Sequence, residues 1–296
     1  MIRIAFSILV FAMSLVAQDR SPVDIIKDPV PPAKRIPYGT DPLQFGELRV
    51  PSGKGPYPVV EIVHGGCWVA KLGNLDEHIV ALDLVRPIAA ALTAMGIATW
   101  NIEYRRLGNP GGGWPGSFED VARGTDYLRK IARENNLDLA RVVTMGHSAG
   151  GHFAIWLAAR PKIPSSSELY SKDPLPIRGV VDLDGPGDLK ATIAIQQPVC
   201  GAPVVTQLLG GTPEEHPERY RAASPIEMLP IGVPQESFAS RMFAGQAPAY
   251  EEAAKRAGDT VHTVILPNAG HFVFIDPKSS AWPEVVRRTK DLLGIQ

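Results

Sequence analysis

Short runs of continuously apolar, often β-branched residues alternate with longer helical patterns along most of this 296-residue chain. The runs typical of buried strands are Pro58–Val63, Ile97–Ile102, Arg141–Met145, Gly179–Leu183 and Val261–Leu266. The helical patterns are Leu82–Met95, Phe118–Glu134, Ala149–Ala159, Ala249–Ala257 and Trp282–Leu293. Strands that are apolar along their whole length are typical of a parallel sheet covered on both sides. The alternation therefore predicts an α/β fold, a mostly parallel central sheet with helices on both faces.

Residues 185–235 interrupt this alternation with a segment that is rich in proline. Open α/β sheets bind their ligands beyond the carboxyl ends of the strands. We therefore expect residues 185–235 to form a cap-like insertion over the site. The α/β domain is expected to span residues 36–296. Residues 18–35, rich in proline and charge, are expected to be a loose leader.

The first seventeen residues have the pattern of a signal peptide. Arg3 is followed by the apolar run Ile4–Val16, which is too short to span a bilayer, and then by the small residue Ala17. Residues 1–17 therefore predict export, to a periplasm or to the cell exterior. Cys67 and Cys200 are the two cysteines, and counting alone leaves open whether they form a disulfide or two separate thiols.

The balance of charge excludes several classes of partner. With 30 basic and 31 acidic residues the net charge is −1, and neither sign forms a long run. Such a chain has no electrostatic footprint for nucleic acid or for an anionic membrane. The sequence also contains no clustered Cys/His ligand set and no glycine-rich phosphate loop after a strand, so no metal or organic cofactor is expected. It does not constrain the oligomeric state.

The strongest chemical signal is the run Gly146-His147-Ser148-Ala149-Gly150, a G-x-S-x-G motif. An expected strand precedes it and a helical pattern without breakers follows it. In that context the serine lies on a sharp strand-to-helix turn with its hydroxyl exposed, and the helix N-terminus adds partial positive charge near a developing oxyanion. Ser148 is therefore the candidate nucleophile.

A second glycine-rich run, Gly65-Gly66-Cys67-Trp68, comes directly after His64 and the first expected strand. Glycines there let backbone N–H groups approach a tetrahedral intermediate, as in the H-G-G type of oxyanion loop. The expected donors are the N–H groups of Gly66, Cys67 and Ala149. Trp68 is expected either to form a wall of the acyl pocket or only to pack.

A third signal is His271, which lies in the run Asn268–Phe272 just after the strand expected at Val261–Leu266. A histidine in a loop after the last strand, later in the chain than the serine, is the position of the general base in this kind of site. His271 is therefore the candidate base for Ser148.

Together these residues resemble the esterase/lipase branch of the α/β-hydrolase fold, near kynurenine-formamidase-like and feruloyl-esterase-like proteins. The resemblance covers about Phe45 to Leu293 and includes the run Asn101–Arg106, the run Gly111–Pro115 and the continuation of the histidine loop to Pro277. Several relatives pair a cysteine of the oxyanion loop with one of the insertion, which implies a Cys67–Cys200 disulfide.

The acid of the catalytic triad is the point where this sequence departs from the family. By the resemblance, the usual acid position falls at or near Ser240, and the surrounding run 235–243 contains no Asp. The strand Gly179–Leu183 carries Asp182 and is followed by Asp184, two positions that share a face in an extended strand. Asp184 lies nearer the carboxyl end and is the preferred acid. Glu236 is the alternative, and a site without an acid remains open.

The chemistry that these residues predict is acyl transfer, in which His271 takes the proton of Ser148 and the serine oxygen attacks a carbonyl carbon. The preferred function is a secreted hydrolase of small-molecule carboxylic esters. The alternatives are an arylformamidase, which cleaves an N-formyl amide by the same mechanism, and a degenerate hydrolase fold that binds without catalysis.

Overall fold

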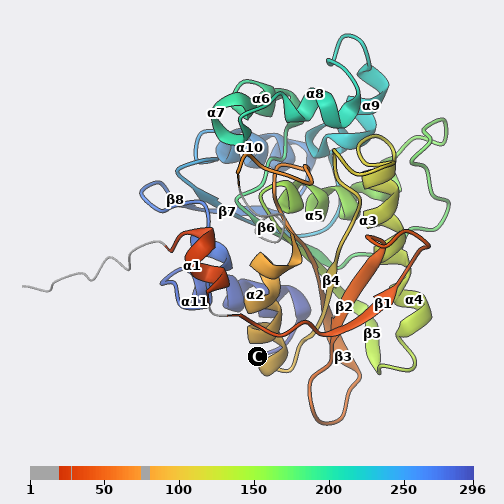
Figure 1. Ribbon diagram of the computed structural model, residues 1–296, viewed down its shortest axis with the longest axis vertical. Helices are drawn as coiled ribbons and strands as arrows, with labels where there is room; N and C mark the ends of the chain where they lie inside the picture. The colour runs from red at the N-terminus through yellow and green to blue at the C-terminus, as the bar shows by residue number, and fades with distance from the viewer. Residues whose placement is uncertain (1–19, 28, 75–80) are drawn as a thin grey trace, which may run out of the picture.

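The computed structural model of the protein describes residues 20–27, 29–74 and 81–296 (Figure 1). Within these residues an eight-stranded sheet has the order β1-β2-β4-β3-β5-β6-β7-β8. The strands are β1 (Lys34–Pro37), β2 (Phe45–Arg49), β3 (Tyr57–Val63), β4 (Ala98–Ile102), β5 (Leu137–His147), β6 (Gly179–Leu183), β7 (Gln235–Ser240) and β8 (Val261–Leu266). The expected signal peptide, residues 1–17, lies outside the described residues.

The sheet is mostly parallel, as predicted. Strands β4, β3, β5, β6, β7 and β8 pair in parallel, whereas β1 and β2 join one edge in antiparallel register. The two antiparallel strands were not predicted from the sequence. They are short, and β1 has mostly exposed, polar positions, so neither shows the apolar run of a central strand.

Helices cover both faces of the sheet. On one face lie α3 (Gly116–Asp126), α4 (Leu128–Ile131), α5 (Ala149–Ala159) and α10 (Ala247–Ala257). On the other face lie α1 (Pro22–Ile26), α2 (Leu82–Ala94) and α11 (Trp282–Leu293). Each face has its own buried apolar cluster. The α/β fold predicted from the alternation is thus confirmed.

Two predicted elements need correction. In the described part of the leader 18–35, residues 22–26 are not loose but form helix α1, capped by Ser21, with the Ile25 side chain buried against α2. The single helix expected over Phe118–Glu134 starts at Gly116 and is divided at Tyr127 into α3 and α4.

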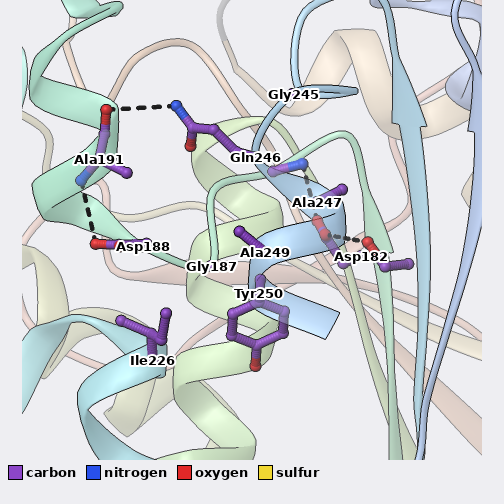
Figure 2. Close-up of a pocket in the computed structure, with 12 residues that line it drawn as sticks. Asp182, Gly187, Asp188, Ala191, Ile226, Gly245, Gln246, Ala247, Ala249 and Tyr250 are labelled. Carbon is purple, nitrogen blue, oxygen red and sulfur yellow. Dashed lines mark hydrogen bonds between the residues drawn. The ribbon is translucent and has the colours of Figure 1, made fainter. Parts of the chain in front are cut away.

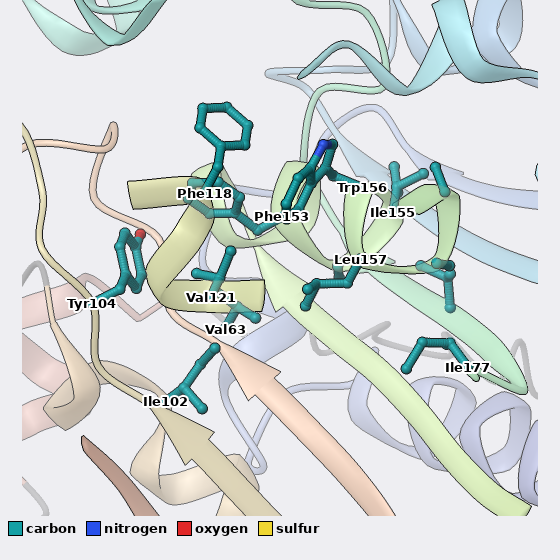
Figure 3. Packing of buried hydrophobic residues seen from close by; sticks show 14 of the residues in the cluster. Val63, Ile102, Tyr104, Phe118, Val121, Phe153, Ile155, Trp156, Leu157 and Ile177 are labelled. Carbon is teal, nitrogen blue, oxygen red and sulfur yellow. The ribbon is translucent and has the colours of Figure 1, made fainter. Parts of the chain in front are cut away.

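Helix α5 is buried along its whole length. All eleven of its residues are buried, and Figure 3 shows Phe153 and Trp156 packed beside Phe118 of α3. The ring centroids of Phe118 lie 5.2 Å from Phe153 and 5.1 Å from Trp156, in edge-to-face arrangements. Because α5 starts directly after Ser148, this packing fixes the position of the serine.

The insertion folds into short helices gathered at one end of the molecule, the top in Figure 1. They are α6 (Leu189–Ile193), α7 (Gln196–Cys200), α8 (Val204–Leu209), α9 (Pro217–Ala223) and the 3-10 turn η3 (Pro225–Met228). No helix in the described ranges has both the length and the apolar character needed to cross a membrane.

Candidate active site

The sheet register brings the loops of the site to one edge. Val63, the last residue of β3, pairs with Gly146 of β5, and Gly146 pairs with Asp182 of β6. The loops that follow these three strands therefore leave the sheet side by side. They carry the glycine-rich run 65–68, Ser148 and Asp184.

Ser148 lies on a sharp turn between β5 and α5. Its φ of +56° is rare for a residue with a side chain and marks a strained backbone. The flanking glycines are required by close contacts. A Cβ on Gly146 would lie 1.9 Å from the Gly150 carbonyl oxygen, and one on Gly150 would lie 2.0 Å from the Val63 carbonyl oxygen. The motif thus has the geometry expected from the sequence.

His271 follows β8 and lines the same cavity as Ser148. Its Nδ1 lies 2.5 Å from Oδ2 of Asp184. Among the described residues no direct hydrogen bond joins the Ser148 hydroxyl to the His271 ring. Catalytic hydrogen bonds are often long without substrate and tighten in the reacting complex. The cavity therefore brings together the two residues that the sequence singled out.

Asp184 lies one residue beyond β6 and is fully buried. Its φ of +59° turns the carboxylate away from the strand direction. The Ser240 backbone N–H donates to Oδ1 at 2.7 Å, and the Ser240 hydroxyl donates to Oδ2, the oxygen that contacts His271. The resemblance put the usual acid position at or near Ser240, and here Ser240 donates two hydrogen bonds to the carboxylate that follows the neighbouring strand. This role of Ser240 was not predicted from the sequence.

Glu236 lies away from the site. It is the second residue of β7, toward the opposite end of the strand from Ser240, and it forms ion pairs with Arg288 and, at 3.3 Å, with His262. The structure therefore does not bring this alternative acid to His271.

Asp182 occupies a separate environment, although it is only two residues from Asp184. It accepts hydrogen bonds from the Ser237 hydroxyl and the Gly185 N–H, both at 2.9 Å. It borders a cavity of about 140 Å³ between α10 and the start of the insertion (Figure 2). Burial raises the pKa of the Asp182 carboxyl to about 8. Burial therefore favours the neutral form of this acid, which does not face His271.

The oxyanion loop has the backbone conformation of a donor nest. Gly66, Cys67 and Trp68 all have positive φ, at +103°, +53° and +58°. Among the described residues, the N–H groups of Gly66, Cys67 and Ala149 donate to no protein acceptor. Successive N–H groups in such conformations form an anion-binding concavity.

Gly65 packs directly on the nucleophile turn. A Cβ there would lie 2.6 Å from the His147 carbonyl oxygen and 3.0 Å from the Ser148 Cβ. Trp68 is buried. Its indole N–H donates to His152 Nδ1 at 3.3 Å, and its ring borders a small void beside Ser148. Trp68 therefore both packs and lines the site.

A buried polar cluster lies directly against the oxyanion loop. His64 Nε2 lies 2.9 Å from Glu103 Oε1, and the Tyr104 hydroxyl donates to the His64 carbonyl oxygen at 3.1 Å. Although burial would raise the pKa of Glu103, the neighbouring His64 and Arg106 keep it below its usual range. Glu103 was given no role from the sequence. Its position directly after a buried strand was the available signal.

His147, the second residue of the serine motif, makes a further contact that was not predicted from the sequence. Its ring lies 4.4 Å from the His271 ring, centroid to centroid, and its Nε2 is 3.0 Å from the His271 carbonyl oxygen. Because a carbonyl only accepts, Nε2 carries the proton. Burial, together with the His271 charge, holds the pKa of His147 well below its usual range. His147 is thus a neutral ring that packs against the His271 ring.

A disulfide joins Cys67 of the oxyanion loop to Cys200 at the end of α7, with their Cα atoms 6.0 Å apart. This is the pairing that the resemblance implied. It attaches the insertion to the loop that carries the expected oxyanion donors.

The cavity shared by Ser148 and His271 has a volume of about 170 Å³. Apolar side chains form most of its remaining wall, namely Leu72, Leu84, Val199, Met242 and Phe272. Within the described ranges, no group of three or more His, Cys, Asp or Glu side chains is placed to hold a metal ion.

A serine on a strand-to-helix turn, at the carboxyl edge of a mostly parallel sheet, is the arrangement of the α/β-hydrolases. Solved structures of this class share the fold. A carbohydrate esterase from gut microbiota, in truncated form, has a TM-score of 0.70 at 19% identity, covering 90% of this chain and 97% of that chain. Esterase B from Lactobacillus Rhamnosis has a TM-score of 0.69 at 20% identity, covering 88% and 85%.

Within this class the chain belongs to the BD-FAE family, whose sequence profile matches residues 48–234. The matched range contains Ser148 and Asp184 but ends before His271. Among curated relatives, esterase LipC of Mycobacterium tuberculosis is 26% identical over 204 residues, 68% of this chain and 48% of that protein. Esterase EstD of Thermotoga maritima is 29% identical over 118 residues, 40% and 27% of the two chains. The chain thus spans about half or less of these curated relatives.

Proposed function

We propose that this protein is an exported serine hydrolase that cleaves small-molecule carboxylic esters through an acyl-enzyme. The observation that carries the proposal is the cavity that Ser148 and His271 share, with His271 held by Asp184 from behind. Family membership and the names of the relatives, which are esterases, agree with this reaction.

In the first half of the reaction the base is His271. The Asp184 carboxylate accepts the Nδ1 proton, which leaves the Nε2 lone pair free to take the proton of Ser148. The serine oxygen attacks the ester carbonyl, and the N–H groups of Gly66, Cys67 and Ala149 stabilise the oxyanion. The intermediate collapses when His271 returns its proton to the leaving alcohol.

In the second half water replaces the alcohol. His271 Nε2 takes a proton from the water, which attacks the acyl carbonyl, and the acid product leaves as Ser148 regains its proton. The Asp184 carboxylate stabilises the imidazolium in both halves. His147, held neutral by burial, adds no second positive charge beside it.

A fluorophosphonate probe, which reacts with activated serines, tests the proposal. We expect wild-type protein to be labelled and to hydrolyse p-nitrophenyl acetate, and Ser148→Ala to do neither while keeping its circular dichroism spectrum. Absence of labelling and turnover in folded wild-type protein would instead support a binding role. An N-formyl aryl amide assayed in parallel distinguishes an esterase from an arylformamidase.

Export is supported by the signal-peptide pattern of residues 1–17 and by the Cys67–Cys200 disulfide, since disulfides persist in oxidising compartments. Intact-mass measurement after expression with the native N-terminus tests it. A mature protein lacking about seventeen residues, recovered outside the cytoplasm, is the expected result. An uncleaved cytoplasmic protein contradicts it.

A further inference from the structure

We propose that the enzyme accepts acyl groups no longer than acetyl and places the alcohol part of its substrate in the larger apolar cavity. The inference rests on the proposed esterase function. Two voids border Ser148. The inference follows from deciding which of them receives the alcohol part of the ester and which receives the acyl part.

The position of His271 decides which void takes the alcohol. His271 must protonate the leaving oxygen, so the alcohol lies on the side where His271 borders the cavity. That is the cavity of about 170 Å³, which Ser148 and His271 both line. Its apolar side chains include Leu72, Leu84 and Phe272, which fit an apolar or aromatic alcohol.

The acyl group must then point to the other side of Ser148. With the carbonyl oxygen directed at the N–H groups of Cys67 and Ala149, the remaining substituent enters a second void. Ser148, Ala149 and Cys67 border this second void, and His271 does not.

The second void is very small. Its volume is about 10 Å³, close to the least that holds one water molecule, about 10–15 Å³. A methyl group is only slightly larger than water, so an acetyl group needs a small adjustment of the wall. Each further methylene would have to displace side chains of a close-packed region.

The wall of the void cannot retreat easily. Trp68 and Val204 are buried in the main apolar cluster, and Phe243 is also buried. Cys200 brings the insertion against the void and is bonded to Cys67 on its other side. A covalent link therefore holds the insertion side of the acyl void to the oxyanion loop.

Hydrolysis rates for p-nitrophenyl acetate, butyrate and octanoate test the inference, because the alcohol is constant in this series. We expect kcat/KM to fall by at least about tenfold from acetate to butyrate and further to octanoate. A second series, methyl, butyl and benzyl acetate, should show no such fall, since the alcohol cavity has room. Equal rates on acetate and octanoate would overturn the inference and leave the esterase function intact. If no ester were hydrolysed, both this inference and the proposed esterase function would be wrong.

Enlarging the void supplies a second test. In Val204→Ala the ratio of butyrate to acetate hydrolysis should rise by about tenfold or more. Ile195 is half-buried, lies just before α7 and borders the same void, so Ile195→Ala serves if Val204→Ala does not fold. Leu72→Ala, which enlarges only the alcohol side, is the matched control and should leave this ratio unchanged. If both enlarging variants fold, label with fluorophosphonate and keep the wild-type ratio, the assignment of the acyl void is wrong.

Discussion

His271 Nδ1 and Asp184 Oδ2 are 2.5 Å apart, although the two residues are separated by 87 positions in the chain. The contact fixes the tautomer of the histidine, because a carboxylate can only accept and Nδ1 must therefore carry the proton. Asp184 in turn is held by two hydrogen bonds from Ser240, at or near the position where the resemblance expected the acid. The carboxylate that contacts His271 and the serine that binds this carboxylate thus come from the ends of two neighbouring strands, β6 and β7.

Replacing Asp184 tests its role directly. Asp184→Asn keeps the shape of the side chain but can present an amide N–H to Nδ1 and so favour the wrong tautomer. We expect kcat on p-nitrophenyl acetate to fall by about four orders of magnitude, as it does when the triad aspartate of a serine protease is changed to asparagine. Glu236→Gln is the control and should change kcat little. Equal, small effects of both substitutions would remove Asp184 from the triad.

Ser240 should act through Asp184. Ser240→Ala removes the hydroxyl that donates to the carboxylate but keeps the backbone N–H bond. Since a hydrogen bond to a charged group contributes about 1.5–3 kcal/mol, we expect kcat to fall roughly ten- to a hundredfold with KM nearly unchanged. Ser237→Ala, whose hydroxyl serves Asp182 instead, is the matched control. A similar loss of kcat in both variants would show that the effect is not specific to Asp184.

Asp182 predicts a pH dependence of stability. Burial raises the pKa of its carboxyl to about 8 in the folded state, from an ordinary value of 3.8. Between these values the folded protein binds more protons than the unfolded chain, so stability falls as pH rises through this window. One such group changes the free energy of unfolding by about 1.4 kcal/mol per pH unit.

Asp182→Asn should remove this contribution. The amide can accept from the Gly185 N–H and donate to the Ser237 hydroxyl, so both hydrogen bonds survive. We expect urea midpoints at pH 6 and pH 8 to differ less in the variant than in the wild type, and the variant to be the more stable protein at pH 8. An unchanged pH slope would show that Asp182 is ionised in the folded protein.

The close packing of Gly65 on the nucleophile turn predicts a loss of activity in Gly65→Ala. The added Cβ would collide with the backbone of His147, so either the serine or the oxyanion loop must shift. Displacements of about 1 Å at a reacting centre lower turnover by about a hundredfold. Gly245→Ala is the control, because a Cβ there meets no atom within 4 Å. Full activity of Gly65→Ala would mean that the loop tolerates displacement.

The disulfide should support both stability and activity. It closes a separation of 133 residues, and removing such a cross-link typically lowers the free energy of unfolding by about 2–4 kcal/mol. Cys200→Ala should therefore have a lower urea midpoint and a lower kcat, because Cys67 provides an expected oxyanion donor. Wild-type protein treated with reductant should match the variant. Retention of full activity by both would show that the loop holds its conformation unaided.

Most of the strands and helices that position the site were predictable because each has a local signal, whereas β7, which ends in Ser240, has no continuous apolar run. The glycines around Ser148 and the apolar runs before and after it identify the turn without any long-range information. Strands β1 and β2 lack that signal. β1 is an edge strand with mostly exposed positions, and β2 is only five residues long and includes a glycine and two charged residues. The helix α1 was missed for a similar reason, because a single buried side chain, Ile25, anchors it.

The acid was harder to predict than the nucleophile or base. Alternation along a strand places Asp182 and Asp184 on one face, yet the strand ends at Leu183, and the positive φ of Asp184 sends its carboxylate elsewhere. Only the hydrogen bonds from Ser240 show why it points at His271. The same is true of His147, whose contact with His271 depends on a loop 124 residues further along.

The bond between Cys67 and Cys200 also sets an order of events in the life of the protein. A ribosome must add Cys200 well after Cys67, so the bridge cannot close while the first half of the chain is emerging. In the folded protein the two Cα atoms are 6.0 Å apart, so helix α7 lies against the oxyanion loop when the bond is closed. The bond therefore keeps the cover of the site attached to the loop whose N–H groups face the serine.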